Sequence, residues 1–464
     1  MILKAAEDTL TEKAMALSAE SYFVVLFPLL DDERREKALG NEDRIIELNS
    51  SIMYLLSFVF PHLSAEFIQT QYPSMYSTLS HSMVRFKLIA PFIRSAIVCL
   101  KTILEAHIES DWFEDKSSLG ELFALLLSFM TDERPKIRKV AQEVVTSLVH
   151  KRADVHAMVC ELISSFCLNS TRKHADDAIH VMPMLKSCLP SFETTEVSIS
   201  SCNNIVAGIQ HCLQLGNNSL ILCLFQQLDL YCRTLIDSSD GIIDKSNGPM
   251  YGVLKRLLDC IWKFSPATGH VEIVSGHILL QSLVSVVVCK IQLSLGKFEA
   301  FQETSKRAFS TLRPYLNNLG SDDGCMLSAV SGYGILFASV FGQDKFKIDP
   351  EVLAESINMI DTVLPSISNL KQNASGERIM DNILPLVAGM LEVLGENITC
   401  PAGSSLLEHL ARLHDCRQLK SRDKLLKCFG VAIRSAGMDT FLSVLPLNLP
   451  KGPNPRAWLI PVLI

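Results

Sequence analysis

The stretch LGELFALLLSFMTDERPKIRKVAQEVVTSLV, residues 119–149, decides the fold class. Its first half repeats leucine and phenylalanine at helical spacing, and this apolar face is wider than that of an isolated surface helix. Thr131 or Asp132 can cap a second helix, and Pro135 suits a first turn because the missing amide is not needed there. From Ile137 onward the apolar residues again fall on one stripe. The stretch predicts two consecutive amphipathic helices that pack together.

The rest of the chain repeats this alternation of apolar helix and polar break. The clearest break is 237–249, which is dense in Ser, Asp and Gly. The run 273–295 is rich in Val and Ser, but its length without a turn signal favours a buried helix over a strand. At about 40 to 45 residues per helix pair, the chain holds about ten or eleven pairs. We predict an all-α fold, a single right-handed α-solenoid of HEAT/armadillo-like helical repeats over residues 1–464.

The deciding stretch also resembles a known repeat and a known family. It places Asp132, Pro135, Arg138 and Ala141 at the offsets of a HEAT repeat. The segment DERPKIRKVAQ resembles sequences of the ribosomal RNA-processing protein 12 family of ribosome-assembly and export factors. The HEAT resemblance implies a structural ladder between Arg138 and the aspartate of a neighbouring turn, here Asp132 or its equivalent.

A second similarity to this family lies near the other end, in 429–449 and 454–464. Arg456 and Trp458 belong to the motif NPRAWLIP, and we expect them to pack the following helix and fix its entry turn, with contact to a partner as the alternative. The apolar run 459–464 has no polar tail behind it. Because the family continues with more repeats and a basic tail, the chain resembles the front half of such a protein.

Composition narrows the class of partner and compartment. The formal net charge of −7 excludes a generally basic nucleic-acid binder, so any RNA contact must be local. Fourteen scattered cysteines without a C-x-x-C pair argue against zinc and disulfides and favour a reducing compartment. The longest apolar stretch, 278–289, is interrupted by polar residues and is expected to be too short and too polar to span a bilayer. We expect no signal peptide.

No catalytic or cofactor-binding sequence motif is present. The chain lacks a phosphate-binding loop, a G-x-S-x-G nucleophile motif and an H-E-x-x-H zinc motif. The glycines of 332–334 lie in an apolar helical segment, which favours close helix packing over a ligand cradle. The segment HADDAIH, residues 174–180, has no accompanying third ligand segment and indicates a solvated helix start. We expect no enzyme, cofactor, metal or small-molecule substrate.

Two basic runs are the candidates for RNA contact. For the first, the alternative is the structural role of Arg138, and for the second it is a solvated helix face. No aromatic residues interleave with the second run, so base stacking is not indicated there. The residues that we assign to nucleic-acid contact are Lys136, Lys139, Lys151, Arg152, Lys420, Arg422 and Lys424.

A helical solenoid offers extended faces and no pocket for chemistry, which indicates a binding protein. The resemblance implies a non-enzymatic factor of the nucleus and nucleolus. Such a factor binds pre-ribosomal particles and ribosomal RNA, supports RNA processing and escorts subunits toward export, with the nuclear transport machinery as a further partner and no membrane. The alternative is a karyopherin-like transport receptor or protein-only scaffold, which shares the architecture and the acidic net charge.

Overall fold

The computed structural model describes residues 2–31, 40–110, 118–190, 199–238, 248–266, 270–317, 323–341, 374–415, 422–449 and 456–463. Helices and turns account for these residues, and no strand occurs among them. The chain divides into two compact units, one formed by Met1–Leu189 with Thr194–Ile205 and the other by Pro190–Glu193 with Val206–Ile464. The fold is an all-α solenoid of helical repeats, as predicted. The single superhelix and its handedness stay predictions.

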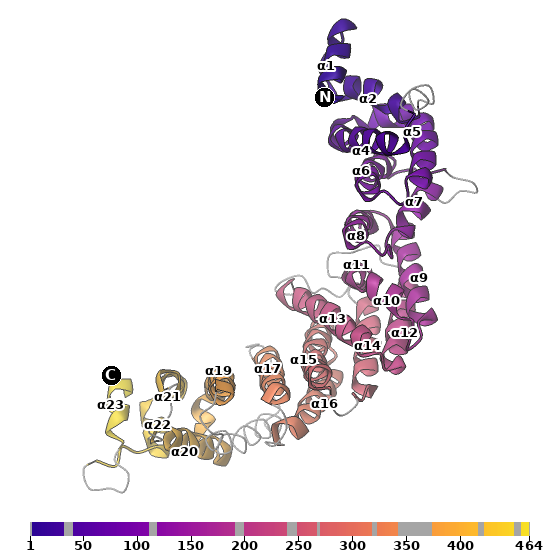
Figure 1. Ribbon diagram of the computed structural model, residues 1–464. Coiled ribbons are helices and arrows are strands. Elements are labelled where there is room, and N and C mark those ends of the chain that lie inside the picture. Colours follow the sequence, from indigo (N-terminus) through magenta and orange to yellow (C-terminus); the bar gives the residue numbers. More distant parts are fainter. Residues whose placement is uncertain are drawn as a thin grey trace. The chain divides into compact units, whose positions relative to one another are not determined.

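The first unit stacks helix pairs in two layers (Figure 1). One layer contains α4, α6 and α8, which we call the front layer, and the other contains α5 and α7, which we call the back layer. The helices of this unit are α1 (Ile2–Glu12), α2 (Ala19–Leu26), η1 (Phe27–Asp31), α4 (Glu42–Val59), η2 (Phe60–His62), α5 (Ala65–Arg85), α6 (Ala90–Ala106), α7 (Ser118–Ser128), α8 (Pro135–Val149), α9 (Ala153–Asn169), α10 (Asp176–Val181), η3 (Met182–Met184) and α11 (Leu185–Cys188).

The second unit also consists of consecutive helices. Its helices are α13 (Asn218–Ser238), α14 (Gly248–Lys263), α15 (Val271–Ser294), α16 (Phe298–Asn317), α17 (Asp323–Phe341), α19 (Ala374–Leu394), η5 (Gly395–Thr399), α20 (Pro401–Asp415), α21 (Arg422–Ala436), α22 (Met438–Val444), η6 (Ala457–Leu459) and α23 (Ile460–Leu463). Helix α12 (Ile199–Leu215) begins in the first unit and ends in the second.

The repeat length can be measured from side-chain contacts between successive helices of one layer. In the first unit these contacts join residues 46 apart, as between the sulfur atoms of Cys99 and Met53 and between the hydroxyls of Tyr72 and Ser118. In the second unit the Cys428 thiol donates to the carbonyl oxygen of Leu384, 44 residues earlier. The spacing grows to 54 between α13 and α15 and between α15 and α17. The repeats are therefore near the predicted length, with insertions in the middle of the chain.

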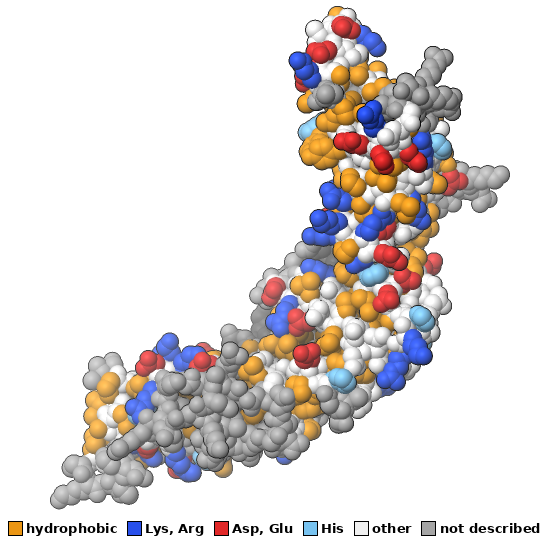
Figure 2. Space-filling view, viewed as in Figure 1, with side chains coloured by type: hydrophobic (Ala, Val, Ile, Leu, Met, Phe, Trp, Pro, Cys, Tyr) orange, Lys and Arg blue, Asp and Glu red, His pale blue; other side chains and the backbone are white. Residues whose placement is uncertain are grey.

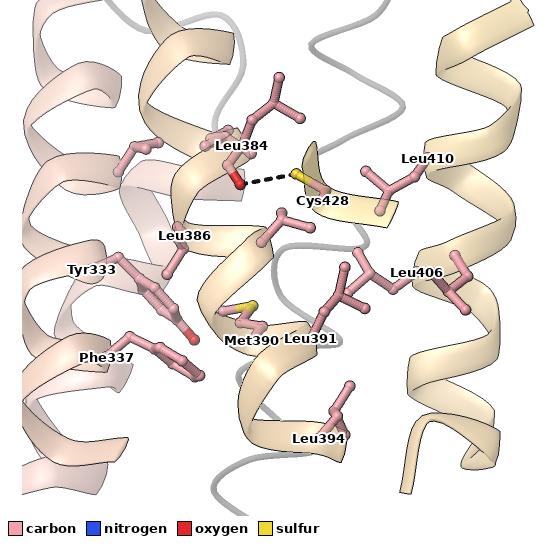
Figure 3. Close-up of a cluster of buried hydrophobic side chains, with 14 of the residues drawn as sticks. Tyr333, Phe337, Leu384, Leu386, Met390, Leu391, Leu394, Leu406, Leu410 and Cys428 are labelled. Atoms are coloured by element: carbon pink, nitrogen blue, oxygen red, sulfur yellow. Dashed lines mark hydrogen bonds between the residues drawn. The ribbon is translucent and has the colours of Figure 1, made fainter. Parts of the chain in front are cut away.

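The core of the second unit is a continuous apolar cluster between neighbouring helices. Figure 3 shows Tyr333 and Phe337 of α17 on one side of α19, and Cys428 with Leu406 and Leu410 of α20 on its other side. The Cys428 Sγ lies 3.2 Å from the Leu384 carbonyl oxygen. Burial raises the pKa of this thiol to about 12, so the sulfur stays protonated and behaves as a small apolar group.

Helix α15 confirms the choice of helix over strand for the Val-rich run. It contacts α13, α14, α16 and α17 and is therefore buried around its circumference. Close packing is confirmed for one of the two predicted glycines, because a Cβ atom at Gly332 of α17 would lie 2.2 Å from the Ser282 Oγ of α15, whereas a Cβ atom at Gly334 would meet nothing within 4 Å. The two helices approach so closely only because position 332 has no side chain.

The longest apolar stretch was expected to be too short and too polar to span a membrane. Judged by the length and composition of the helix that contains it, this expectation was wrong. Among the described residues, Asn218–Asp237 and Val271–Ser294 are long and apolar enough to cross one, and the bent pair Met380–Thr399 and Pro401–Asp415 would add a third span if it formed one. In the structure 67% of the most apolar window of α15 is buried. The polar residues Gln281, Ser282 and Ser285 lie within this helix without ending it, and their side chains are buried.

Candidate nucleic-acid interface

The turn before α8 carries the HEAT signature and holds two arginines. The Asp132 carboxylate accepts hydrogen bonds from the backbone N–H and from the guanidinium of Arg134, at 2.7 to 2.9 Å. These bonds lower the pKa of the Asp132 carboxyl group. Arg138 donates from Nη1 to the backbone oxygen of Asp132, at 2.7 Å. The expected contact between Arg138 and Asp132 is therefore present, but it uses the backbone oxygen of Asp132, since the carboxylate is taken by Arg134.

The start of α8 also differs from the expectation. The cap residue is Arg134, with extended backbone and no side-chain cap, and Pro135 is the first helical residue as predicted. Asp132 acts two residues earlier, where it closes the turn. The Nη1 and Nη2 atoms of Arg134 donate to the carbonyl oxygens of Leu88 and Lys87, respectively, both at 3.0 Å, just before α6. Arg134 thus joins the beginnings of two successive front-layer helices.

A second arginine does the same at the other end of α8. The guanidinium of Arg152 pairs with Asp154 and donates to the carbonyl oxygens of Ile108, at 2.9 Å, and Ser110, both just after α6. The Arg152 side chain is only 15% exposed. Hydrogen bonding from Arg152 also lowers the pKa of Asp154. The donors of Arg152 already hold backbone carbonyls and Asp154, so its contacts favour a structural role over phosphate contact.

Lys151, the neighbour of Arg152, forms an ion pair with Glu105 of α6 at 2.8 Å. The paired charges neutralise each other locally, so Lys151 adds little to a positive field. By contrast, Lys136 and Lys139 lie on the exposed stripe of α8. The Lys139 side chain is 76% exposed, and its ammonium lies 3.9 Å from the Glu143 carboxylate one turn on. These two lysines remain the candidates of the first run.

The structure adds Arg94, which the sequence reading missed. It is exposed on α6, 45 positions before Lys139, so the repeat spacing of 46 places it almost level with that lysine on the neighbouring helix. Packed helices lie about 8 to 10 Å apart. Figure 2 shows Lys and Arg side chains gathered beside α6 and α8. We call Arg94, Lys136 and Lys139 the basic face; aligning the sequence with itself at the repeat spacing would have found Arg94.

The second basic run lies in the other unit. Lys420 is outside the described residues, and Arg422 is the exposed first residue of α21. The Lys424 ammonium lies 2.8 Å from the Asp381 carboxylate of α19 and joins two successive helices. This run therefore offers a partly neutralised surface.

The family-like motif near residue 458 serves packing. The Arg456 backbone N–H donates to the Leu447 carbonyl oxygen at 2.9 Å, and its guanidinium donates to the Pro446 carbonyl oxygen at 3.2 Å. Trp458 stacks on His414 with ring centroids 3.7 Å apart and lies 5.1 Å from Phe429. Arg456 thus fixes the turn as expected, whereas Trp458 packs against the preceding α20 and α21 rather than the following helix.

The segment 174–180 forms the exposed turn before α10 and the helix itself. His180 serves through its backbone oxygen, which accepts from the Gln142 side chain of α8 at 2.6 Å. In the ranges that the structure describes, no group of three or more His, Cys, Asp and Glu side chains is arranged to hold a metal ion.

Known proteins match the chain over most of its length. The family model described as "RRP12-like, N-terminal HEAT repeats" matches residues 1–238, and the model described as "Ribosomal RNA-processing protein 12, HEAT repeats" matches residues 339–464. The human RRP12-like protein is 21% identical over 401 residues, which are 80% of this chain and 28% of that protein. The Drosophila melanogaster RRP12-like protein is 24% identical over 44% of this chain and 16% of its own length.

The Ribosomal RNA-processing protein 12 of Saccharomyces cerevisiae is 20% identical over 100% of this chain and 39% of its own length. The chain therefore spans well under half the length of these relatives. Both HEAT segments occur in the order that the resemblance predicted, and the first alone covers more than half of the 464 residues. The chain belongs to the RRP12 family of HEAT-repeat proteins.

Proposed function

We propose that this protein is a non-enzymatic ribosome-biogenesis factor of the nucleus and nucleolus that binds pre-ribosomal RNA through the basic face. The names of its relatives, which include a ribosomal RNA-processing protein, support the role in ribosome biogenesis. The observation that carries the RNA contact is the exposure of Arg94, Lys136 and Lys139 on adjacent helices. In a chain of net charge −7, such a local excess is what attracts phosphates.

The position of the basic face favours phosphate contact further. Lys136 lies in the first turn of α8 and Arg94 near the start of α6, where the helix dipoles add positive potential. Neither helix carries an acidic residue in its first turn. The exposed carboxylate of Glu143 lies one turn further along α8 and offsets only part of this field.

The test is binding of the full chain to structured ribosomal RNA across a salt series. Each phosphate contact contributes roughly 0.7 to 0.9 to the slope of log affinity against log salt concentration. We expect the double variant Lys136→Ala, Lys139→Ala to lower the slope by about 1.5. The matched control is Lys255→Ala, Arg256→Ala, which removes two exposed basic residues from α14. Equal slopes for the two double variants and the unchanged chain would refute the basic face.

A cellular experiment tests the wider role. Depletion of the protein is expected to accumulate unprocessed ribosomal RNA precursors and to retain new subunits in the nucleus. If precursors and subunit export stay unchanged while the protein still captures a nuclear protein partner without RNA, the karyopherin-like adaptor replaces the proposed function.

A further inference from the structure

Two aromatic side chains lie exposed next to each other on α4. Tyr54 and Phe58 are 55% and 58% exposed and stand one helical turn apart. Their ring centroids are 4.9 Å apart and their planes meet at 84°. In this edge-to-face arrangement, the ring that points its edge at the other keeps both of its faces clear of its neighbour. Leaving two aromatic rings exposed to water costs free energy, and the packing of α4 against its neighbours does not explain it.

The aromatic pair lies on the same side of the front layer as the basic face. The Met53 sulfur lies 3.9 Å from the Cys99 sulfur, so the middle of α4 packs against the middle of α6. Each of α4 and α6 has layer neighbours on its flanks and α5 or η1 against its buried side. Their exposed stripes must therefore face away from the back layer. On α4 this stripe ends in Tyr54 and Phe58, and on α6 it contains Arg94 and the half-buried Lys101.

The spacing between the aromatic and basic groups suits one nucleic-acid strand. The repeat spacing of 46 places Arg94 level with residue 48 of α4, six residues before Tyr54. Six residues span about 9 Å along a helix, and adjacent helices lie about 8 to 10 Å apart. The backbone positions of Tyr54 and Arg94 are therefore roughly 13 Å apart. Single-strand sites cover roughly 4 to 16 nucleotides, which is ample for this span.

We infer that Tyr54 and Phe58 form a stacking platform for an unpaired base of an RNA strand whose phosphates lie on the basic face. This inference rests on the proposed function and adds that the RNA is single-stranded where it crosses α4. Aromatic rings beside a basic track are the arrangement that binds single strands, because every base has an apolar face to stack. An apolar protein partner would instead leave Arg94 and Lys101 without a counter-charge.

Acidic residues limit where the strand can run. Glu47 is exposed on the same stripe of α4, two turns before Tyr54, and Glu105 lies near the end of α6. The Glu105 carboxylate is paired with Lys151 and contributes little repulsion. Glu47 disfavours phosphates over the first half of α4. The strand is therefore expected to approach Tyr54 from α6 rather than along α4.

The test compares two RNA probes of equal length, a 12-nucleotide oligoadenylate and a 12-base-pair duplex. We expect Tyr54→Ala and Phe58→Ala each to weaken oligoadenylate binding by roughly 5- to 150-fold, with the duplex affinity unchanged. Since no charge is removed, the salt slope should not change. The control Val84→Ala trims a residue of α5 that is 67% exposed in the back layer, and it should have no effect. The conservative variant Tyr54→Phe should keep most of the affinity.

A second readout does not depend on affinity. In the variant Phe58→Trp, stacking of adenine should quench the fluorescence of the new indole, and the duplex should not. Unchanged oligoadenylate affinity in Tyr54→Ala and Phe58→Ala, or equal losses for both probes, would overturn the platform. If the lysine variants of the basic face lower the salt slope while the aromatic variants do nothing, only this inference fails. If neither set changes binding, the proposed function fails with it.

Discussion

Replacement of Arg152 by alanine tests whether this residue holds two repeats together or contacts RNA. Its guanidinium donates to the carbonyl oxygens of Ile108 and Ser110 and pairs with Asp154, in a site where the side chain is 15% exposed. Ile108 and Ser110 are half-buried, so the two carbonyls left without a donor cost together about 2 to 3 kcal/mol, whereas the half-exposed carboxylate of Asp154 regains water. We therefore expect Arg152→Ala to lower the free energy of unfolding of the first unit by about 2 to 3 kcal/mol.

The adjacent residue provides the matched control. Lys151 forms a single ion pair with Glu105, and both side chains are partly exposed. Such pairs contribute about 0 to 1 kcal/mol, so Lys151→Ala should destabilise the unit by no more than that. Arg152→Lys keeps the charge but loses the planar fork that reaches several acceptors at once, so we expect an intermediate value.

Urea unfolding followed by circular dichroism at 222 nm gives the stability, and amide hydrogen exchange locates the change. Exchange is expected to accelerate in Arg152→Ala at the end of α6 and the start of α9, and not in the second unit. Equal unfolding midpoints for Arg152→Ala and Lys151→Ala would refute this reasoning. A salt slope lowered by about 1 with unchanged stability would return Arg152 to the phosphate contacts.

Three further substitutions have defined outcomes. Gly332→Ala should lower the melting temperature because overpacking costs about 1 to 3 kcal/mol, and adding Ser282→Gly should restore most of the loss. His277 is buried and its pKa is lowered by desolvation, so it favours the folded state fully above the unfolded pKa of about 6.5 and less as pH falls below it. The slope of urea midpoint against pH between about 6.5 and 5 should therefore flatten in His277→Gln. Trp458→Ala removes the stack on His414 and should cost about 2 kcal/mol, less than a core tryptophan because Trp458 is only half-buried; an unchanged unfolding curve would contradict this packing role.

Periodicity predicted the fold because every helix of a solenoid must bury a stripe against its neighbours. The Val-rich α15 was recognised as a helix by length, although its apolar residues surround the whole helix. The glycine at 332 was placed correctly at a close contact for the same reason, since a glycine in a helix that is apolar all round has little other use.

Partners within the turns were harder to predict. Arg134 and Arg138 stand four residues apart, and both reach Asp132. The extended backbone at Arg134 places its side chain beside the Asp132 carboxylate, whereas Arg138 reaches only the backbone oxygen from inside α8. A sequence shows that two arginines and one aspartate are close, but the backbone angles decide which pair forms.

The distinction between structural and binding arginines and lysines follows from position on the repeat. Arg134 and Arg152 stand at the two ends of α8, where the carbonyl groups flanking α6 need donors. Lys136 and Lys139 stand on the exposed stripe between these ends, where, within the described part of the chain, Lys139 pairs with Glu143 of α8 itself rather than with a neighbouring helix. Basic residues at the helix ends thus hold successive helices together, and basic residues on the exposed stripe are available to bind a ligand. Because successive helices pack at the repeat spacing, Arg94 and Lys139 lie nearly level on neighbouring helices, and Tyr54 lies six residues beyond the level of Arg94 on α4, although no short motif connects the three residues.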